Sequence, residues 1–142
     1  MSTNEKSKNF SEESDDVNID ISDFSNEKIG RGVWHSWHRT GFKANSRSDV
    51  VVIYAFILLY VNNMICQICN THAKEYITKT DYIVEILENH KLTDSEVIEE
   101  FNVWLYNFHR HANMNAGKTS PSYEEVAKFY LGLEVCHDGC GK

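Results

Sequence analysis

Twelve apolar residues follow one another from Val50 to Val61, and no other stretch restricts the fold so strongly. Spanning a bilayer takes roughly 20 residues, so this run is too short to cross a membrane. Its β-branched start, Val50 to Ile53, suits a strand, but the run continues to the length of a helix. We therefore predict a buried helix over 50–63, apolar on most sides, with Ser48 and Asp49 as its N-terminal cap.

The rest of the chain carries helical spacing as well. Thr93 and Glu96 form a capping box before a long helix that Gly117 ends. Ser120 and Pro121 have the residue types of an N-cap and first helical position. No convincing alternating strand pattern occurs. We predict an all-α domain, a four-helix bundle with an additional short helix, whose helices besides 50–63 cover about 32–41, 66–79, 83–87, 93–115 and 120–131.

The length of 142 residues predicts one folded domain flanked by two other segments. Residues 1–28 contain eight Asp or Glu and three Lys, so they carry −5 of the formal net charge of −7. This segment has too little apolar surface to offset its ordering entropy and is predicted to be disordered. The domain then covers 29–131, and 132–142 form a flexible tail.

Composition also argues against some partners and locations. No basic cluster is large enough for a nucleic-acid interface. The N-terminal residues lack the apolar stretch of a signal peptide and are acidic where a mitochondrial transit peptide is basic. We expect a protein without nucleic-acid or membrane partners that stays in the compartment where it is made.

Four cysteines occur as two close pairs, Cys66–Cys69 and Cys136–Cys140. Without a secretory signal, paired cysteines favour redox chemistry or metal binding. A thioredoxin-like site would need a βαβ pattern, which is absent. A four-thiolate zinc site in a non-catalytic helical adaptor is the alternative to a redox pair. Cys66 and Cys69 begin a predicted helix, where the helix N-terminus stabilises a thiolate.

Two predicted helices place an aromatic or polar pair on one face. Trp34 and His38 are four residues apart, and so are His109 and Asn113. Together they would suit a large, flat, polar ring, although either pair alone is more typical of a core with a histidine at its rim. His111 would point roughly 200° away from His109 around the same helix, so the two cannot share a metal.

Three blocks of sequence, in this order, resemble the signature of the Erv/ALR sulfhydryl oxidases, the family of augmenter of liver regeneration. The blocks are GRGVWHSWH at 30–38, CQICNTH at 66–72 and WLYNFHRHANMNAGK at 104–118. The resemblance covers about residues 29–131. It departs from the family pattern at Arg110 and Ala112, which stand where Asn and Val are usual, and at Ile65, which stands where proline is common. The family's additional structural disulfide has no cysteines here.

The resemblance implies FAD held in the bundle, and it assigns the cofactor contacts residue by residue. Cys69 would face the flavin and donate electrons to it, and Cys66 would face outward and exchange with substrate thiols. Cys136 and Cys140 would act as a shuttle on the tail. The residues implied to contact FAD are Arg31, Trp34, His38, His72, His109, Asn113, Lys118 and Tyr130.

The implied function is a thiol oxidase that forms disulfide bonds in protein substrates. Electrons would pass from thiols through Cys66–Cys69 to FAD and then to oxygen, which becomes hydrogen peroxide; cytochrome c stays open as the acceptor. The family habit predicts a homodimer. The minimal form resembles those carried by large cytoplasmic DNA viruses, which implies the host cytoplasm or the virion. The mitochondrial intermembrane space is the alternative.

Overall fold

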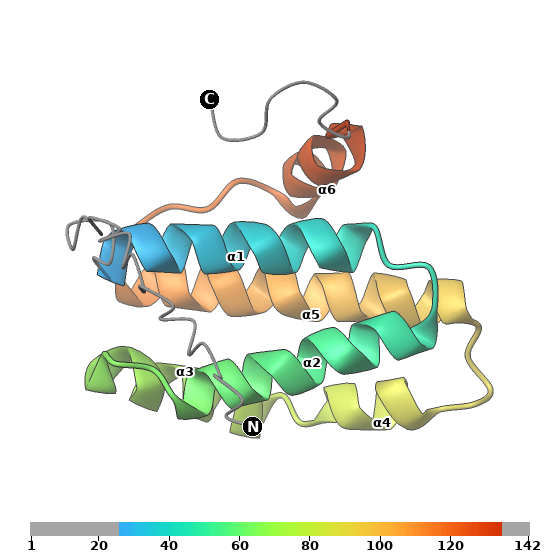
Figure 1. The fold of residues 1–142 in the computed structure, drawn as a ribbon, viewed down its shortest axis with the longest axis horizontal. Coiled ribbons are helices and arrows are strands. Elements are labelled where there is room, and N and C mark those ends of the chain that lie inside the picture. Colours follow the sequence, from blue (N-terminus) through green and yellow to red (C-terminus); the bar gives the residue numbers. More distant parts are fainter. Residues whose placement is uncertain (1–25, 135–142) are drawn as a thin grey trace, which may run out of the picture.

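The computed structural model describes residues 26–134, and within them the fold is all-α (Figure 1). This confirms the all-α part of the predicted fold. The acidic segment up to residue 25 and the tail from residue 135, with Cys136 and Cys140, lie outside the described residues. The helices are α1 (Asn26–Phe42), α2 (Arg47–Asn62), α3 (Gln67–Lys79), α4 (Tyr82–Glu88), α5 (Asp94–Asn115) and α6 (Tyr123–Gly132).

The long helix α5 is the element on which α1, α2, α3 and α4 pack. It begins at the predicted capping box, in which Thr93 accepts from the backbone N–H of Glu96 and the Glu96 carboxylate accepts from that of Thr93. It ends before Gly117, whose φ of 69° suits glycine. Phe101, Trp104 and Leu105 are fully buried on its inner side.

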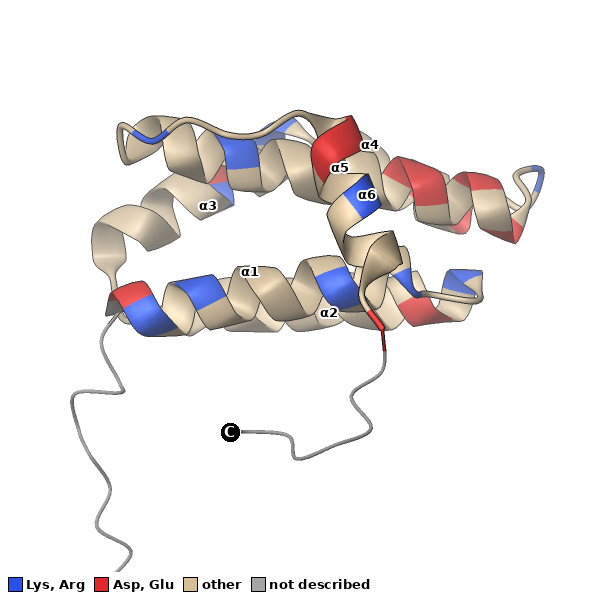
Figure 2. Cartoon of the chain, turned by 90° about the horizontal axis from the view of Figure 1, so that it is seen from above, with Lys and Arg blue, Asp and Glu red and all other residues tan. Residues whose placement is uncertain are grey.

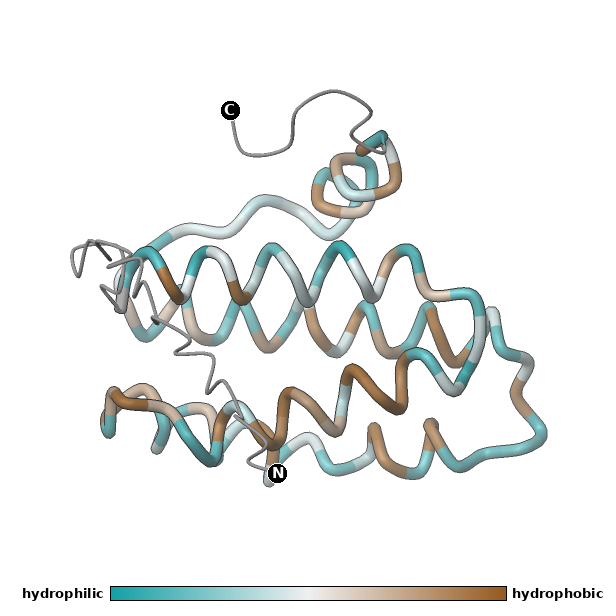
Figure 3. Tube along the Cα trace, in the orientation of Figure 1, coloured by the Kyte–Doolittle hydropathy of each residue, from teal (hydrophilic) through white to brown (hydrophobic). Residues whose placement is uncertain are grey.

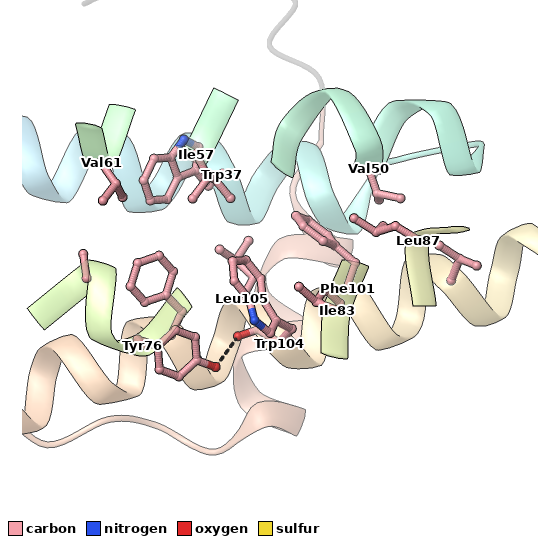
Figure 4. Packing of buried hydrophobic residues seen from close by; sticks show 13 residues of the cluster. Trp37, Val50, Ile57, Val61, Tyr76, Ile83, Leu87, Phe101, Trp104 and Leu105 are labelled. Carbon is pink, nitrogen blue, oxygen red and sulfur yellow. Dashed lines mark hydrogen bonds between the residues drawn. The ribbon is translucent and has the colours of Figure 1, made fainter. Parts of the chain in front are cut away.

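The core lies between α5 and the helices that cover it (Figure 4). Trp104 is its largest fully buried side chain. The Tyr76 hydroxyl on α3 donates to the backbone oxygen of Trp104 at 3.0 Å, which ties α3 to α5. Trp104 in turn donates from Nε1 to the Thr80 hydroxyl at 2.9 Å. Both aromatic residues therefore bury their rings while keeping their polar atoms paired.

Helices α1 and α5 approach closely at Gly41, which the sequence had suggested only as a helix end. A Cβ at this position would lie 2.6 Å from Asn102 Oδ1. Asn102 is itself buried and donates from Nδ2 to the Gly41 oxygen at 3.0 Å. The absence of a side chain at Gly41 therefore sets the distance between the two helices that carry the predicted aromatic and histidine pairs.

Two helix starts differ from the prediction by about two residues. The N-cap of α2 is Ser46, not Ser48, because Asp49 stands three residues after Ser46 and completes a capping box. The N-cap of α6 is Ser122, which forms the same arrangement with Glu125. Ser120, the predicted cap, instead accepts from Asn113 Nδ2 at 2.9 Å.

Helix α1 starts earlier than the sequence suggested. Asn26, Glu27 and Lys28 are helical, so the predicted disorder was wrong for the last three residues of segment 1–28. Glu27 pairs with Arg31 one turn later at 2.6 Å, which supports this first turn.

The outer face of α2 carries exposed apolar side chains. Val52, Phe56 and Leu59 are 68%, 56% and 59% exposed. Their spacing puts them on one side of α2, which is strongly hydrophobic along its length (Figure 3). Helix α2 carries its charged residues, Arg47 and Asp49, in its first turn, and acidic residues also lie at the start of α5 and on α6 (Figure 2). No helix among residues 26–134 has the length and apolar content to cross a membrane.

Candidate functional site

The cysteine pair sits where α2 ends and α3 begins. Cys66 is the N-cap of α3, and its sulfur accepts from the backbone N–H of Cys69 at 3.3 Å. Asn70 holds this junction together, because its Nδ2 donates to the Val61 oxygen at the end of α2. The predicted position of the pair at a helix start is confirmed.

The two thiols have different acidities. A side-chain hydrogen bond from Cys69, helped by the backbone N–H of Cys69, lowers the pKa of Cys66. The same side-chain hydrogen bond, together with burial and the charge of Cys66, raises the pKa of Cys69. Both cysteines lie near the surface, Cys66 half-buried and Cys69 exposed as whole residues. The pKa directions make Cys66 the first thiolate, which suits exchange.

The cysteines open onto a cavity of about 460 Å³ between α1, α2, α3 and α5. Its walls include the aromatic side chains of Trp34, Trp37, Tyr60 and Phe108. The residues that line it include no Asp, Glu, Lys or Arg. An uncharged aromatic cavity of this size is typical of a site for a flat organic ligand.

The predicted aromatic and histidine pairs meet between α1 and α5. The rings of Trp34 and His109 stack with centroids 4.3 Å apart and planes 2° from parallel. His38 Nε2 and His109 Nδ1 share a hydrogen bond of 3.0 Å. His38 is 1% exposed, and its Nδ1 has no hydrogen-bond partner among residues 26–134. An unpaired buried nitrogen is costly, so it marks a position where a ligand atom would be stabilising.

Both histidines of this cluster are neutral at pH 7. Burial, and then the charge of His109, lowers the pKa of His38 to about 3. Burial, and then the charge of Lys118, lowers the pKa of His109 to about 4. The imidazoles therefore act as hydrogen-bonding groups in this cluster and not as cations.

These pKa directions predict a pH dependence of stability for the protein without cofactor. The unfolded chain binds protons at both positions below about pH 6.5, whereas the folded chain does not until near pH 4. The free energy of unfolding should therefore decrease as the pH falls through that window, by up to about 1.4 kcal/mol per pH unit for each histidine. Denaturant unfolding between pH 7.5 and 5 measures it, and His109→Gln should remove about half the slope. An unchanged slope would mean that His109 is not buried as described.

A second cavity of about 300 Å³ lies on the other side of His109, between α5 and α6. His38, Arg110, Asn113 and Tyr130 line it together with His109. Tyr130 stacks against His38 with centroids 5.3 Å apart. The two cavities thus flank the Trp34–His109 stack, one beside the cysteines and the other beneath α6.

The structure brings together most of the residues that the resemblance assigns to FAD. His72 lines the larger cavity with Cys66, Cys69 and Trp34. Arg31 and Lys118 line neither cavity. Arg31 is 75% exposed in its side chain and pairs with Glu27, and Lys118 is exposed in the loop after α5.

The residues of the larger cavity that the sequence analysis did not assign to the site include Trp37, Tyr60, His111 and Asn115. His111 does point away from His109, as its spacing predicts, but it faces the cavity that contains the cysteines. The His111 ring packs against Tyr76, and its Nε2 shares a hydrogen bond of 3.2 Å with Asn115 Nδ2. Burial, and then the charge of Cys69, raises the pKa of Tyr60, whose side chain lines the same cavity as that thiol. No pattern within a single helix identifies these residues, because they come together with the cysteines only where α1, α2 and α5 pack beside α3.

A metal site finds no support in this part of the chain. Among residues 26–134, no group of three or more His, Cys, Asp or Glu is arranged to hold a metal ion. The four-thiolate alternative needs Cys136 and Cys140, which are outside the described residues.

The described helices define a domain with a cysteine pair at the mouth of an uncharged aromatic cavity. No protein-family model matches the chain, and neither a curated protein nor a solved structure matches it. The function therefore has to be inferred from the residues and their geometry.

Proposed function

We propose that this protein is an FAD-dependent sulfhydryl oxidase that forms disulfide bonds in protein substrates. The observation that carries the proposal is the single cavity shared by Cys66, Cys69 and Trp34, beside the stacked His109. Each block of the resemblance contributes to that cavity or to its wall. A core with incidental cysteines would not require these three distant segments to meet around an uncharged space.

The residues present fit FAD. The larger cavity has flat aromatic walls and no charged lining residue, which suits an isoalloxazine ring. His38 Nδ1 is a buried nitrogen without a partner among the described residues, and Arg110 gives the smaller cavity, which Glu125 also lines, one cation for a phosphate. We propose that α1, α2, α3 and α5 form the four-helix bundle that holds the cofactor. Bound there, FAD would supply the two-electron chemistry that links a dithiol to oxygen and yields hydrogen peroxide.

The cysteine pair performs the exchange with substrate. A substrate thiolate attacks Cys66 Sγ, the Cys66–Cys69 bond breaks, and Cys69 leaves as a thiolate that takes a proton. The second substrate thiol then loses its proton and attacks the mixed disulfide, which releases Cys66 and completes the substrate disulfide. The lowered pKa of Cys66 favours this last step, because a more acidic thiol leaves faster. Two electrons and two protons have then moved from the substrate to the pair.

Cys69 is the proposed donor to the cofactor. Its charge acts on Tyr60, which lines the aromatic wall beside Trp37 with ring centroids 5.3 Å apart. Returning the pair to its disulfide removes two electrons and two protons from Cys66 and Cys69. Cys136 and Cys140 are proposed as a relay between substrate and this pair.

The proposal includes a homodimer. The exposed stripe of Val52, Phe56 and Leu59 on α2 supports it, because apolar side chains on one face of a helix mark an association surface. The host cytoplasm or virion, or the mitochondrial intermembrane space, stays a proposal of the resemblance alone.

Flavin binding tests the proposal directly. The purified chain should be yellow, or should take up about one FAD per chain, and anaerobic dithiothreitol should bleach it. Because a ligand of the native state alone adds RT ln(1 + [L]/Kd) to stability, FAD at 100 times its Kd should add about 2.7 kcal/mol. A cofactor-free chain whose melting temperature FAD leaves unchanged would exclude this function.

A further inference from the structure

Two isoleucines beside the cysteines are exposed to an unusual degree. Ile65 precedes Cys66 in the bend between α2 and α3, and Ile68 precedes Cys69 in the first turn of α3. Their exposed fractions are 83% and 72%, the highest among the large apolar side chains. Both line the larger cavity. The structure thus keeps two apolar side chains out of its own core, one next to each sulfur.

Among residues 26–134, no Asp, Glu, Lys or Arg lines this cavity, so no charged side chain of this part of the chain opposes an apolar partner there. The lining residues around the two isoleucines include Asn63, Met64 and His72, none of them carboxylate, Lys or Arg. A substrate segment with charged neighbours would therefore meet apolar surface without compensation. A segment with apolar neighbours would cover surface that is otherwise in water.

The position of the two isoleucines beside the cysteines indicates that a substrate polypeptide covers them. A substrate sulfur must come within bonding distance of Cys66 Sγ, so the residues next to the substrate cysteine have to lie on Ile65, Ile68 or both. Neither isoleucine is needed for the fold, because both are largely in solvent. Helix α2 also has its own exposed stripe of Val52, Phe56 and Leu59, which leaves these two for another contact.

We propose that Ile65 and Ile68 form an apolar collar around the cysteine pair, which selects cysteines flanked by apolar residues in extended or unfolded polypeptide. This inference rests on the proposed oxidase function and names its substrate class. Small dithiols bypass the collar, because they present no neighbouring side chain. Burying about 50 Å² of apolar surface at the collar is worth roughly tenfold in rate.

The test compares two capped hexapeptides whose single cysteine is flanked by leucines or by serines, which leaves the peptides alike in charge. Each is mixed anaerobically with the full-length chain in its Cys66–Cys69 disulfide form, and the mixed disulfide is counted after acid quenching. The leucine peptide should react about tenfold faster. The double variant Ile65→Ser/Ile68→Ser should make the leucine peptide react at the rate of the serine peptide, so that the ratio of the leucine-peptide rate to the dithiothreitol rate falls about tenfold. Leu131→Ser, at an exposed apolar position on α6, is the matched control and should change neither rate.

Three other outcomes would contradict the proposal that Ile65 and Ile68 select the substrate. Equal rates for the two peptides on the unmodified chain would do so, and continued dithiothreitol oxidation would show that the oxidase function itself stands. Equal slowing of both peptides and dithiothreitol in the double variant would mean that the isoleucines position the cysteines. A change from dimer to monomer on sedimentation would mean that a second copy of this chain covers them.

Discussion

Replacing either cysteine of the pair, as Cys66→Ser or Cys69→Ser, is expected to reduce dithiol-dependent oxygen consumption at least about 100-fold. Neither thiol alone can form the disulfide that carries two electrons. Both positions are at the surface end of α3, and serine keeps an N-cap acceptor at residue 66, so the fold should survive. An oxygen electrode measures the rate, and flavin absorbance with circular dichroism checks cofactor and fold.

Gln67→Ala is the matched control, because Gln67 lies between the cysteines and does not line the cavity. It should retain nearly full activity. Retained turnover in either cysteine variant would remove the pair from the reaction. Mixed with the disulfide form of a substrate, Cys69→Ser should still be trapped as a mixed disulfide at Cys66, the more acidic thiol, because its thiolate attacks the substrate disulfide and no second cysteine resolves the product. Trapping by Cys69 in Cys66→Ser, with none at Cys66, would reverse the two roles.

The second large effect is expected from Trp34→Ala and His109→Ala, the two residues whose rings stack between α1 and α5. Trp34 contacts Trp37, Phe108 and His109, so removing its side chain leaves a gap in the packing between α1 and α5. Loss of a well-packed tryptophan costs about 3–5 kcal/mol at a fully buried position, and Trp34 is half-buried, so the lower end applies. FAD affinity should fall at least about tenfold in each variant, since each loses a wall of the site. Titration of FAD into stripped protein and thermal melts with and without FAD measure both effects.

Arg31→Ala separates the contribution of the structure from that of the resemblance. The resemblance assigns Arg31 to the cofactor, whereas the side chain is 75% exposed and paired with Glu27. An exposed pair of this kind contributes little to stability. We expect FAD affinity within about twofold of the unmodified chain. A loss as large as that of His109→Ala would extend the site to the outer face of α1.

Local rules predicted much of the secondary structure. The capping box of Thr93 and Glu96 and the stop at Gly117 each depend on residues within one or two turns, and the 50–61 run is a single continuous segment of about three turns. Where two serines competed as caps, the acidic residue three positions on decided, at Asp49 for α2 and Glu125 for α6. This local signal was present in the sequence, and weighing it would have corrected both helix starts.

Local sequence patterns predicted only part of the candidate site. Spacing put Trp34 with His38, and His109 with Asn113, because residues four apart share a helix face. It could not show that His38 bonds to His109, 71 positions away in the chain, or that His38 is buried with an unpaired nitrogen. Those facts depend on the distance between α1 and α5, which the contact of Gly41 with Asn102 sets.

The sequence by itself determined the helices and the position of Cys66–Cys69 at a helix start, because these follow from interactions within about four residues. The tertiary structure alone decided that Tyr60 and His111 join the cysteines in one cavity and that Arg31 stays in solvent. It also left Ile65 and Ile68 exposed beside the sulfurs. Burial and acidity arise where distant helices pack, and no short-range pattern encodes which faces will meet.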